Sequence, residues 1–280
     1  MNLGVHVSAA GNIYEALDRA HGLKCNAMQI FSRNPRQWRQ LKLTPNDVKE
    51  FRKRRKDYGI ESVVVHVPYL INLASPYKTL YKKSITAYIE DLNECEQIGA
   101  DFLVTHMGSH AKTSEISGID RFAEALNTIF NKTEGIKAML LLENTSGSGS
   151  WLGYKFEHHK MIYSRVAERQ RVGLCVDTAH AFAAGYDLRT QKGLDHMINE
   201  IDRLVGIDKV KVVHLNDSKK DFESRLDHHE HIGKGKIGTA GIRRVVREPR
   251  LKDPVFILET PKANEDDDKM NLKVVRKMFK

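Results

Sequence analysis

The chain has 280 residues, of which 41% are hydrophobic and 29% charged, proportions that are ordinary for a globular protein and sufficient to bury the core of one large α/β domain. Its formal net charge of +9 favours a polyanionic partner, although a merely basic surface would give the same charge. Three scattered cysteines without a CxxC pair argue against a disulfide framework and favour a reducing compartment.

The first six residues predict a strand, and they lack the basic region and the long apolar region of a signal peptide. No apolar run is long enough to span a membrane. We therefore expect a cytoplasmic protein with no membrane partner.

Short apolar runs alternate with segments of helical spacing along the whole chain. Thr44 and Pro45 provide the cap and first-turn proline of one helix, and Gly99 ends the next. The predicted strands are 3–7, 27–31, 62–66, 102–106, 139–143, 172–177, 210–214 and 255–259. The predicted helices are 11–21, 44–58, 76–98, 118–131, 156–169, 190–204 and 239–247, with a last basic helix opened by 264–268.

The run 172–177 predicts a strand that is buried on both faces. It ends at Asp177, and His180 follows in the loop that we expect there; by themselves these two could be a capping aspartate and a surface histidine. In a barrel of parallel strands, the carboxyl ends of all strands surround one mouth, so polar residues can recur at the carboxyl end of every strand. Core helices give no reason for such a recurrence. Five further runs end in a residue that can bind a metal: His66, His106, Glu143, His214 and Glu259.

Eight strand–helix units without a composition break or linker predict a (β/α)₈ TIM barrel that forms a single domain over residues 1–280. The glycine-rich segment 144–150 lacks the lysine of a P-loop and the spacing of a dinucleotide site. The basic run 52–56 could bind phosphate, but a solvated helix face is the favoured interpretation.

Acidic and histidine side chains should therefore gather at the barrel mouth, joined by Asp227 and His229 from the polar segment 215–238. One ion takes about three or four protein ligands, so this set implies two or three ions with bridging carboxylates. Nitrogen and oxygen donors without cysteine favour Zn²⁺ or Mn²⁺ over Mg²⁺, and such a site would bind a phosphodiester. The expected ligands are His66, His106, Glu143, Asp177, His180, His214, Asp227, His229 and Glu259.

The remaining histidines are interpreted as structural or surface residues. They include His6, His21, His158, His159 and His196. For any single ligand histidine, a hydrogen-bonded barrel residue is the competing interpretation. That interpretation explains the whole set poorly.

Nine segments together carry a family pattern: 6–11 (HVSAAG), 34–38 (NPRQW), 66–74 (HVPYLINLA), 106–110 (HMGSH), 142–145 (LENT), 175–187 (CVDTAHAFAAGYD), 214–219 (HLNDSK), 227–229 (DHH) and 258–261 (LETP). With these segments the chain resembles the endonuclease IV family of apurinic/apyrimidinic endonucleases nearly from end to end. The resemblance implies a (β/α)₈ barrel with three zinc ions, and the nine expected ligands match the ligand positions of the family.

The resemblance also implies how these ligands divide. Glu143 would bridge two ions, and Glu143 and Glu259 would be the catalytic residues. The first ion would also take His66 and His106, the second Asp177, His214 and Glu259, and the third His180, Asp227 and His229.

The implied activity is that of base excision repair. It is hydrolysis of the phosphodiester 5′ to an abasic site in double-stranded DNA, leaving a 3′-hydroxyl and a 5′-deoxyribose phosphate. Arg36, Tyr69 and Leu70 match residues that enter the DNA stack and expose the abasic nucleotide. Because that nucleotide has no base, its extrusion avoids most of the pairing and stacking cost. We expect a monomer that is associated with the nucleoid if the source is prokaryotic.

Two alternatives stay open. One is a metal-dependent sugar isomerase or epimerase on the same barrel, and the other is a DNA-binding module without catalysis. Metal content separates the three, because the endonuclease needs about three ions per chain, the sugar enzyme one or two, and the binding module none.

The chain departs from the family pattern at four positions. Pro68, Ala179, Glu223 and His228 stand where the family usually has Ser, Cys, Gly and Arg. None of these changes removes a metal ligand. Pro68 fixes its own φ and restricts the residue before it, so we expect it to alter the loop that carries Tyr69. The loss of a basic residue at 228 should weaken a phosphate contact.

Overall fold

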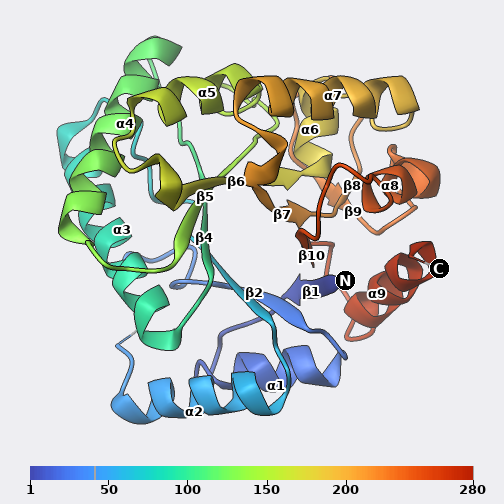
Figure 1. Ribbon diagram of the computed structural model, residues 1–280, viewed down its shortest axis with the longest axis horizontal. Coiled ribbons are helices and arrows are strands. Elements are labelled where there is room, and N and C mark those ends of the chain that lie inside the picture. The colour runs from blue at the N-terminus through green and yellow to red at the C-terminus, as the bar shows by residue number, and fades with distance from the viewer. Residues whose placement is uncertain (41, 280) are drawn as a thin grey trace.

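Eight parallel strands close into a barrel, and helices surround it (Figure 1). The computed structural model describes residues 1–40 and 42–279; positions 41 and 280, which belong to the predicted domain, lie outside the described residues. The barrel strands are β1 (Asn2–His6), β2 (Ala27–Phe31), β3 (Ser62–His66), β4 (Phe102–His106), β5 (Met139–Glu143), β6 (Val172–Asp177), β7 (Val210–His214) and β10 (Val255–Leu258). Their order around the barrel is β1-β10-β7-β6-β5-β4-β3-β2, which confirms the predicted TIM barrel.

A helix or helices follow each barrel strand. The α-helices are α1 (Glu15–Gly22), α2 (Pro45–Asp57), α3 (Lys78–Ile98), α4 (Glu115–Lys132), α5 (Phe156–Arg165), α6 (Thr178–Ala184), α7 (Gln191–Leu204), α8 (Gly238–Val246) and α9 (Asp267–Met278). Two short 3₁₀ helices, η1 (Arg169–Arg171) and η2 (Ile207–Lys209), lead into β6 and β7.

The alternation of side chains along the strands divides the core in two. On β3, Val63 and Val65 pack outward against the helices, whereas Val64 points into the barrel. Because side chains repeat every two residues, the residue two positions beyond an inner side chain points into the barrel mouth. The inner cluster consists of Ala27, Val64, Val104, Leu141, Cys175, Val212, Val255 and Ile257.

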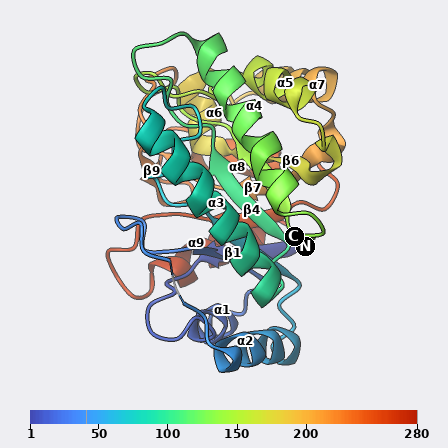
Figure 2. The same ribbon diagram turned by 90° about the vertical axis from the view of Figure 1, so that its left-hand side faces the viewer.

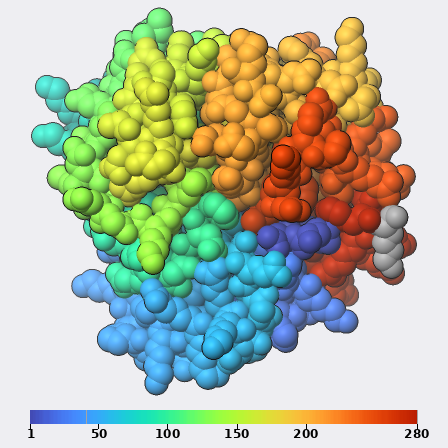
Figure 3. Space-filling model, in the orientation of Figure 1, coloured from blue at the N-terminus to red at the C-terminus, as the bar shows by residue number. Residues whose placement is uncertain are grey.

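The side view separates the two ends of the barrel. The N-terminus, where β1 begins, lies at one side of this view, and β9 (His229–Glu230) lies at the other, with the barrel mouth (Figure 2). α3 and α4 lie next to one another on the outside of the barrel. In the space-filling view the blue N-terminal residues adjoin the red C-terminal region (Figure 3), where β1 pairs with β10. Within the described residues, no helix is both long enough and apolar enough to cross a bilayer.

The loop predicted after Asp177 is in fact a helix, so that prediction was wrong. α6 begins directly after β6, and the Asp177 side chain caps it by accepting a hydrogen bond from His180 N at 2.7 Å. The helix is short and almost entirely buried, so it lacks the amphipathic period by which helices are recognised in a sequence. This helix places His180 one turn beyond Asp177 and on the same side.

Other element boundaries also differ from the prediction. α1 begins at Glu15 instead of position 11, where Gly11 has a φ of 84°, and α5 ends at Arg165 instead of position 169. The polar segment 215–238 contains a small antiparallel sheet of β8 (Asp217–Ser218) and β9 that was not predicted. The buried Asp217 carboxylate holds this segment, because it accepts hydrogen bonds from backbone N–H groups between positions 233 and 238.

Candidate metal centre

Glu143 lies at the centre of the barrel mouth. It ends β5, it is only 1% exposed, and its two oxygens face different histidines. Oε2 lies 3.0 Å from His66 Nε2 and 3.2 Å from His106 Nε2. Oε1 lies 3.0 Å from His214 Nδ1 and 3.4 Å from His180 Nδ1. One carboxylate therefore joins the ends of β3, β4 and β7 to α6.

A second group of ligand atoms lies where β6, β7 and β10 end. Oxygen and nitrogen atoms of Glu143, Asp177, His214 and Glu259 all lie within 4.8 Å of one another. His214 Nδ1 is 3.2 Å from Glu259 Oε2, so this nitrogen faces carboxylates on two sides. Asn216 Nδ2 donates to Asp177 Oδ2 at 2.7 Å and fixes that carboxylate.

A third group lies between α6 and β9. His180 Nε2 is 3.1 Å from Asp227 Oδ2, and His229 Nε2 is 3.4 Å from Asp227 Oδ1. Asp177 also contributes, because its Oδ2 is 3.5 Å from His229 Nε2. All nine expected ligands therefore lie in one continuous cluster, although Asp177 stands between the second and third groups instead of belonging clearly to one.

The other nitrogen of the ligand histidines shows whether this cluster suits a cation. His66 Nδ1, His180 Nδ1 and His229 Nδ1 bond the backbone oxygens of Val67, Asn144 and Glu259 at 2.6, 2.9 and 2.9 Å. A carbonyl oxygen only accepts, so each of these nitrogens must carry the proton. In a neutral ring, Nε2 then presents a lone pair toward a carboxylate.

Lone pairs that face carboxylate oxygens repel each other unless a cation or a proton lies between them. His229 Nε2 is buried and has no hydrogen-bond partner among the described residues. Histidines that anchor one nitrogen on an acceptor and present the other to carboxylates are the usual surroundings of a metal ion. The donor set therefore fits divalent cations.

Protons are the alternative to a cation at these positions. Burial raises the pKa of the Glu143 carboxyl, but His214 and His106 outweigh this and hold its pKa well below the ordinary range. Burial lowers the pKa of His180, yet Asp177 and Asp227 raise it well above its ordinary value. The carboxylates therefore stay ionised and favour positive charge among them, which protons on the imidazoles or divalent cations can supply.

The comparisons with known proteins agree with the barrel fold. The family described as "Xylose isomerase-like TIM barrel" matches residues 17–278. A probable endonuclease 4 of Halothermothrix orenii is 43% identical over 272 residues, which cover 97% of this chain and 98% of that protein. A probable endonuclease 4 of Chloroflexus aurantiacus is 42% identical over 276 residues, with 98% and 97% covered. The solved structure of endonuclease IV from Thermus thermophilus superimposes with a TM-score of 0.89 at 37% identity, over 100% of this chain and 99% of that chain.

The chain belongs to the endonuclease IV family. The resemblance seen in the sequence is thereby confirmed. A D-tagatose 3-epimerase-like protein also superimposes, with a TM-score of 0.78, but at 19% identity it shares the fold alone. The sugar isomerase alternative gains no support beyond that fold.

Three polar residues of this endonuclease IV family member also touch the site but were not singled out from the sequence. Asn144 Oδ1 accepts from Asp177 N at 2.8 Å, and Asn216 Oδ1 accepts from Glu259 N at 2.8 Å. Gln29, on β2, contacts both His214 and Glu259. Asn144 and Asn216 stand one and two positions beyond a strand end, and Gln29 interrupts an apolar strand. In a sequence, each of these features is only a weak indication of a site residue. His6, interpreted as structural or surface, has its Nδ1 3.5 Å from Glu259 Oε1 at the edge of the site.

The residues that match DNA contacts of the family lie on loops around the mouth. Tyr69 is 59% exposed, and its ring centroid lies 6.0 Å from that of His106. Arg36 is exposed and Leu70 is half-buried. A cavity of about 210 Å³ opens beside the ligands, and Trp151, which the sequence interpretation passed over, is part of its wall. The cavity is lined by Tyr69, His106, Thr145, Ser146, Ser148, Trp151, His180 and Asp227.

The departures from the endonuclease IV pattern lie on three segments: Pro68 in the loop after β3, Ala179 in α6, and Glu223 and His228 in the segment 215–238. Pro68 and Ala179 are buried, and His228 is exposed. Glu223 has a φ of 59°, in the left-handed region that favours glycine, which explains why the family usually has glycine there.

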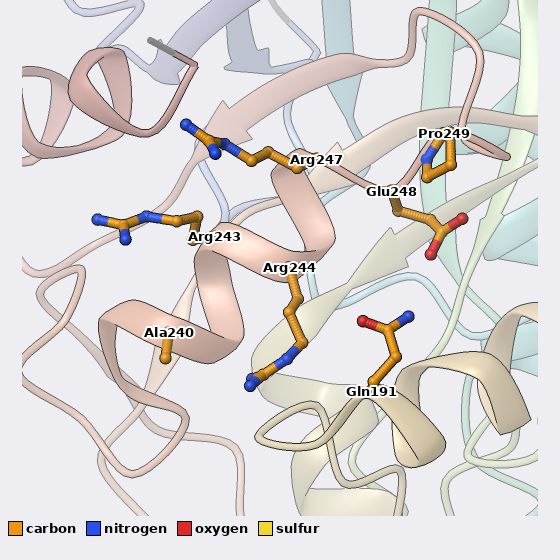
Figure 4. Close-up of a pocket in the computed structure, with 7 residues that line it drawn as sticks. All are labelled: Gln191, Ala240, Arg243, Arg244, Arg247, Glu248 and Pro249. Atoms are coloured by element: carbon orange, nitrogen blue, oxygen red, sulfur yellow. The ribbon is translucent and has the colours of Figure 1, made fainter.

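The basic residues outside the mouth serve structure more than the sequence indicated. Arg52, Lys53 and Lys56 are exposed, as expected for a solvated helix face, and Arg52 also donates from Nε to Gln97 O at 2.8 Å at the carboxyl end of α3. A hollow of about 350 Å³ between α7 and α8 is lined by arginines (Figure 4). Arg247 in that hollow donates to Met278 O at 2.7 Å, and Arg243 and Arg247 point away from Gln191.

Proposed function

We propose that this protein is a metal-dependent endonuclease of base excision repair. It hydrolyses the phosphodiester 5′ to an abasic site in double-stranded DNA and leaves a 3′-hydroxyl and a 5′-deoxyribose phosphate. The single observation that carries the proposal is the cluster around Glu143, in which imidazole lone pairs and carboxylates converge on shared volumes. Membership of the endonuclease IV family supports DNA as the substrate.

The proposed cofactor is three zinc ions per chain, with manganese as a possible substitute. When bound, such cations act as Lewis acids that polarise a phosphoryl oxygen and make water a better nucleophile. His66, His106 and Glu143 would hold one ion. Glu143, Asp177, His214 and Glu259 would hold the second, and His180, Asp227 and His229 the third, with Asp177 close enough to assist.

Glu143 and Glu259 are the proposed catalytic residues, because both would hold the cofactor. Glu143 has one oxygen on the His66 side and the other on the His214 side, so it would contribute a ligand to each of two ions. Glu259 Oε1 accepts a hydrogen bond from Gln29 at 2.6 Å, which leaves Oε2 facing His214 Nδ1. Preorganised charge of this kind stabilises a transition state without reorganisation during the reaction.

The loops supply the proposed selectivity for damage. Tyr69 stands exposed beside the cavity, where its ring can stack in the gap left by a missing base. Arg36 and Leu70 lie on neighbouring loops and would help to expose the abasic nucleotide. A nucleotide without a base is extruded at low cost, and the cavity next to the ligands would receive its sugar.

We propose a monomer, in the cytoplasm, whose residues 1–280 form one catalytic domain. The cysteines are buried and unpaired, which suits a reducing compartment.

The test is cleavage of a duplex that carries one tetrahydrofuran abasic-site analogue. The purified protein should cut this strand once, on the 5′ side of the analogue, and leave a 3′-hydroxyl that a DNA polymerase extends. Chelation should abolish the cut and added zinc should restore it, whereas a matched duplex without the analogue should stay intact. Equal cleavage of both duplexes, or full activity in chelator, would contradict the proposal.

A further inference from the structure

Gln29 lies on β2 and is fully buried, with 0% exposure. Its neighbours in the barrel are His6 on β1 and Val64 on β3. It stands two residues beyond Ala27 of the inner cluster, so the strand period directs it into the mouth at the level of the metal ligands. β2 contributes no ligand to the proposed metal centre, and Gln29 occupies the position where a ligand would stand.

The Gln29 side-chain amide makes three polar contacts, all of them within the site. Its Oε1 lies 2.8 Å from His214 Nε2. Its Nε2 donates to Glu259 Oε1 at 2.6 Å and contacts His6 Nδ1 at 2.9 Å. The opposite orientation of the amide would place its carbonyl oxygen against the Glu259 carboxylate, so the network fixes which atom faces which partner.

This orientation of the Gln29 amide determines which ring nitrogen of His214 carries the proton. Because Gln29 Oε1 only accepts, His214 Nε2 carries a proton, and in the neutral ring the lone pair lies on Nδ1. Nδ1 is the atom that faces Glu143 Oε1 at 3.0 Å and Glu259 Oε2 at 3.2 Å. The same amide holds the other oxygen of Glu259, so one side chain orients two ligands of a single ion.

We propose that Gln29 is a positioning residue for the ion shared by Glu143, Asp177, His214 and Glu259. This inference rests on the proposed function, since it requires that the cluster binds metal. Residues that orient metal ligands typically change metal affinity about 10–100-fold when they are replaced. Within the described residues Gln29 makes no hydrogen bond to His66, His106, His180 or His229, so its effect should be confined to one ion.

The competing interpretation is that Gln29 only fills the top of the barrel. Gln29→Met separates the two, because methionine has nearly the same length and volume but offers neither the donor nor the acceptor of the amide. Gln29→Asn is the second variant, because it stays polar yet is one methylene too short to reach both ligands. Ile257→Val is the control, because it removes a methyl group from the barrel interior two residues before Glu259 without changing a polar contact.

The experiment measures zinc binding by the full-length chain. Metal-free wild type and variants are titrated with Zn²⁺ in competition with a chromophoric chelator, and the melting temperature of each metal-free protein is measured in parallel. We expect one of three ions to bind about 10–100-fold more weakly in Gln29→Met and Gln29→Asn. The other two ions, and all three in Ile257→Val, should bind as in the wild type.

The outcomes distinguish this inference from the proposed function. If wild type binds three ions and both Gln29 variants bind all three with wild-type affinity, the positioning role is overturned. An equal weakening of all three ions, with an unchanged melting temperature, would overturn the assignment to one ion. If Gln29→Met does not fold, the Gln29→Asn titration decides between the same outcomes. A wild-type chain that binds no zinc would overturn the proposed function itself.

Discussion

At the scale of single residues, Glu143 is the side chain whose charge the site most depends on. It is the only carboxylate among the nine proposed ligands whose two oxygens face four different histidines. Glu143→Gln keeps the shape but removes the charge that would bridge two ions. We expect kcat on an abasic duplex to fall by at least about 100-fold, while the dissociation constant at one fixed salt concentration changes little.

Glu94→Gln is the matched control for Glu143→Gln. It makes the same substitution at a buried glutamate of α3 that has no part in the proposed site. We expect it to keep wild-type kcat. Cleavage by Glu143→Gln at a near wild-type rate would show that the bridging role is wrongly assigned.

Glu94 also makes the stability of the protein depend on pH. Both of its carboxyl oxygens are buried without a hydrogen-bond partner among residues 1–40 and 42–279, and burial, together with the charge of Asp91, raises its pKa from 4.5 to about 9. Between these values the folded protein binds a proton that the unfolded chain has released, so the free energy of unfolding falls as pH rises. The loss is at most about 1.4 kcal/mol per pH unit.

Glu94→Gln removes this titration. Urea unfolding at pH 5, 7 and 9 should show that the variant gains stability relative to wild type with each step upward. The decisive quantity is the slope of the free energy of unfolding against pH. The buried amide of the variant also costs stability, but that cost does not change with pH. Parallel curves for the two proteins would mean that Glu94 is ionised in the folded state.

At the scale of elements, the loops after β2 and β3 bring Arg36 and Tyr69 to the mouth. The first loop is anchored at its base, because the buried Arg33 donates from Nη1 to Trp38 O at 2.7 Å and from Nε to Asp91 Oδ1 at 3.0 Å. Arg36 itself is exposed, as is Tyr69. A rigid base with exposed tips is suited to entering a DNA stack with little loss of conformational entropy.

Replacing both Arg36 and Tyr69 by alanine tests that role. Stacking on a base is worth about 1–3 kcal/mol, so affinity for abasic duplex should fall about 10–100-fold, and affinity for intact duplex much less. Metal content and melting temperature should stay unchanged. Both dissociation constants must be measured at the same salt concentration, because phosphate contacts make affinity salt-dependent.

The chain offers a control with the same change in charge and aromatic content. Tyr77 is 58% exposed and does not line the cavity, and Arg39 is exposed in the same loop as Arg36. The double change of Tyr77 and Arg39 to alanine should leave the preference for abasic duplex intact. An equal loss on both duplexes for the Arg36 and Tyr69 variant would mean that these residues only contact the backbone.

At the scale of the whole molecule, the proposed ions would join strands that are distant in sequence. The nine proposed ligands come from the ends of six barrel strands and from the segments that follow β6 and β7. Metal that binds only the folded barrel stabilises it by mass action, by about 2.7 kcal/mol at a free concentration 100 times the dissociation constant. Removing it should therefore lower the melting temperature by more than about 5 °C.

Elemental analysis of the native protein should find close to three transition-metal ions per chain, mainly zinc. Added zinc should restore the melting temperature after chelation, and added magnesium should not, because imidazole-rich sites suit zinc better. A reproducible content of one ion or fewer in active protein, or a melting temperature that chelation does not change, would contradict the trinuclear site.

The sequence by itself determined the barrel and the residues at its mouth. Val64 and His66, or Val104 and His106, show how: the strand period of two puts an apolar residue inside the barrel and a ligand above it. A polar residue at the carboxyl end of an apolar run is visible without any knowledge of its neighbours. The family pattern then supplied the roles that spacing alone could not assign.

Only the tertiary structure decided which of these residues touch. Closure of the barrel pairs Asn2 with Val255, and no local pattern encodes a contact between positions so far apart. That closure brings Gln29 to His214 and Glu259, and it places Asp177 between two ligand groups. The protons on His180, His214 and His229 are likewise set by acceptors on other strands or loops, namely Asn144 O, Gln29 Oε1 and Glu259 O, so they become known only when the strands are assembled.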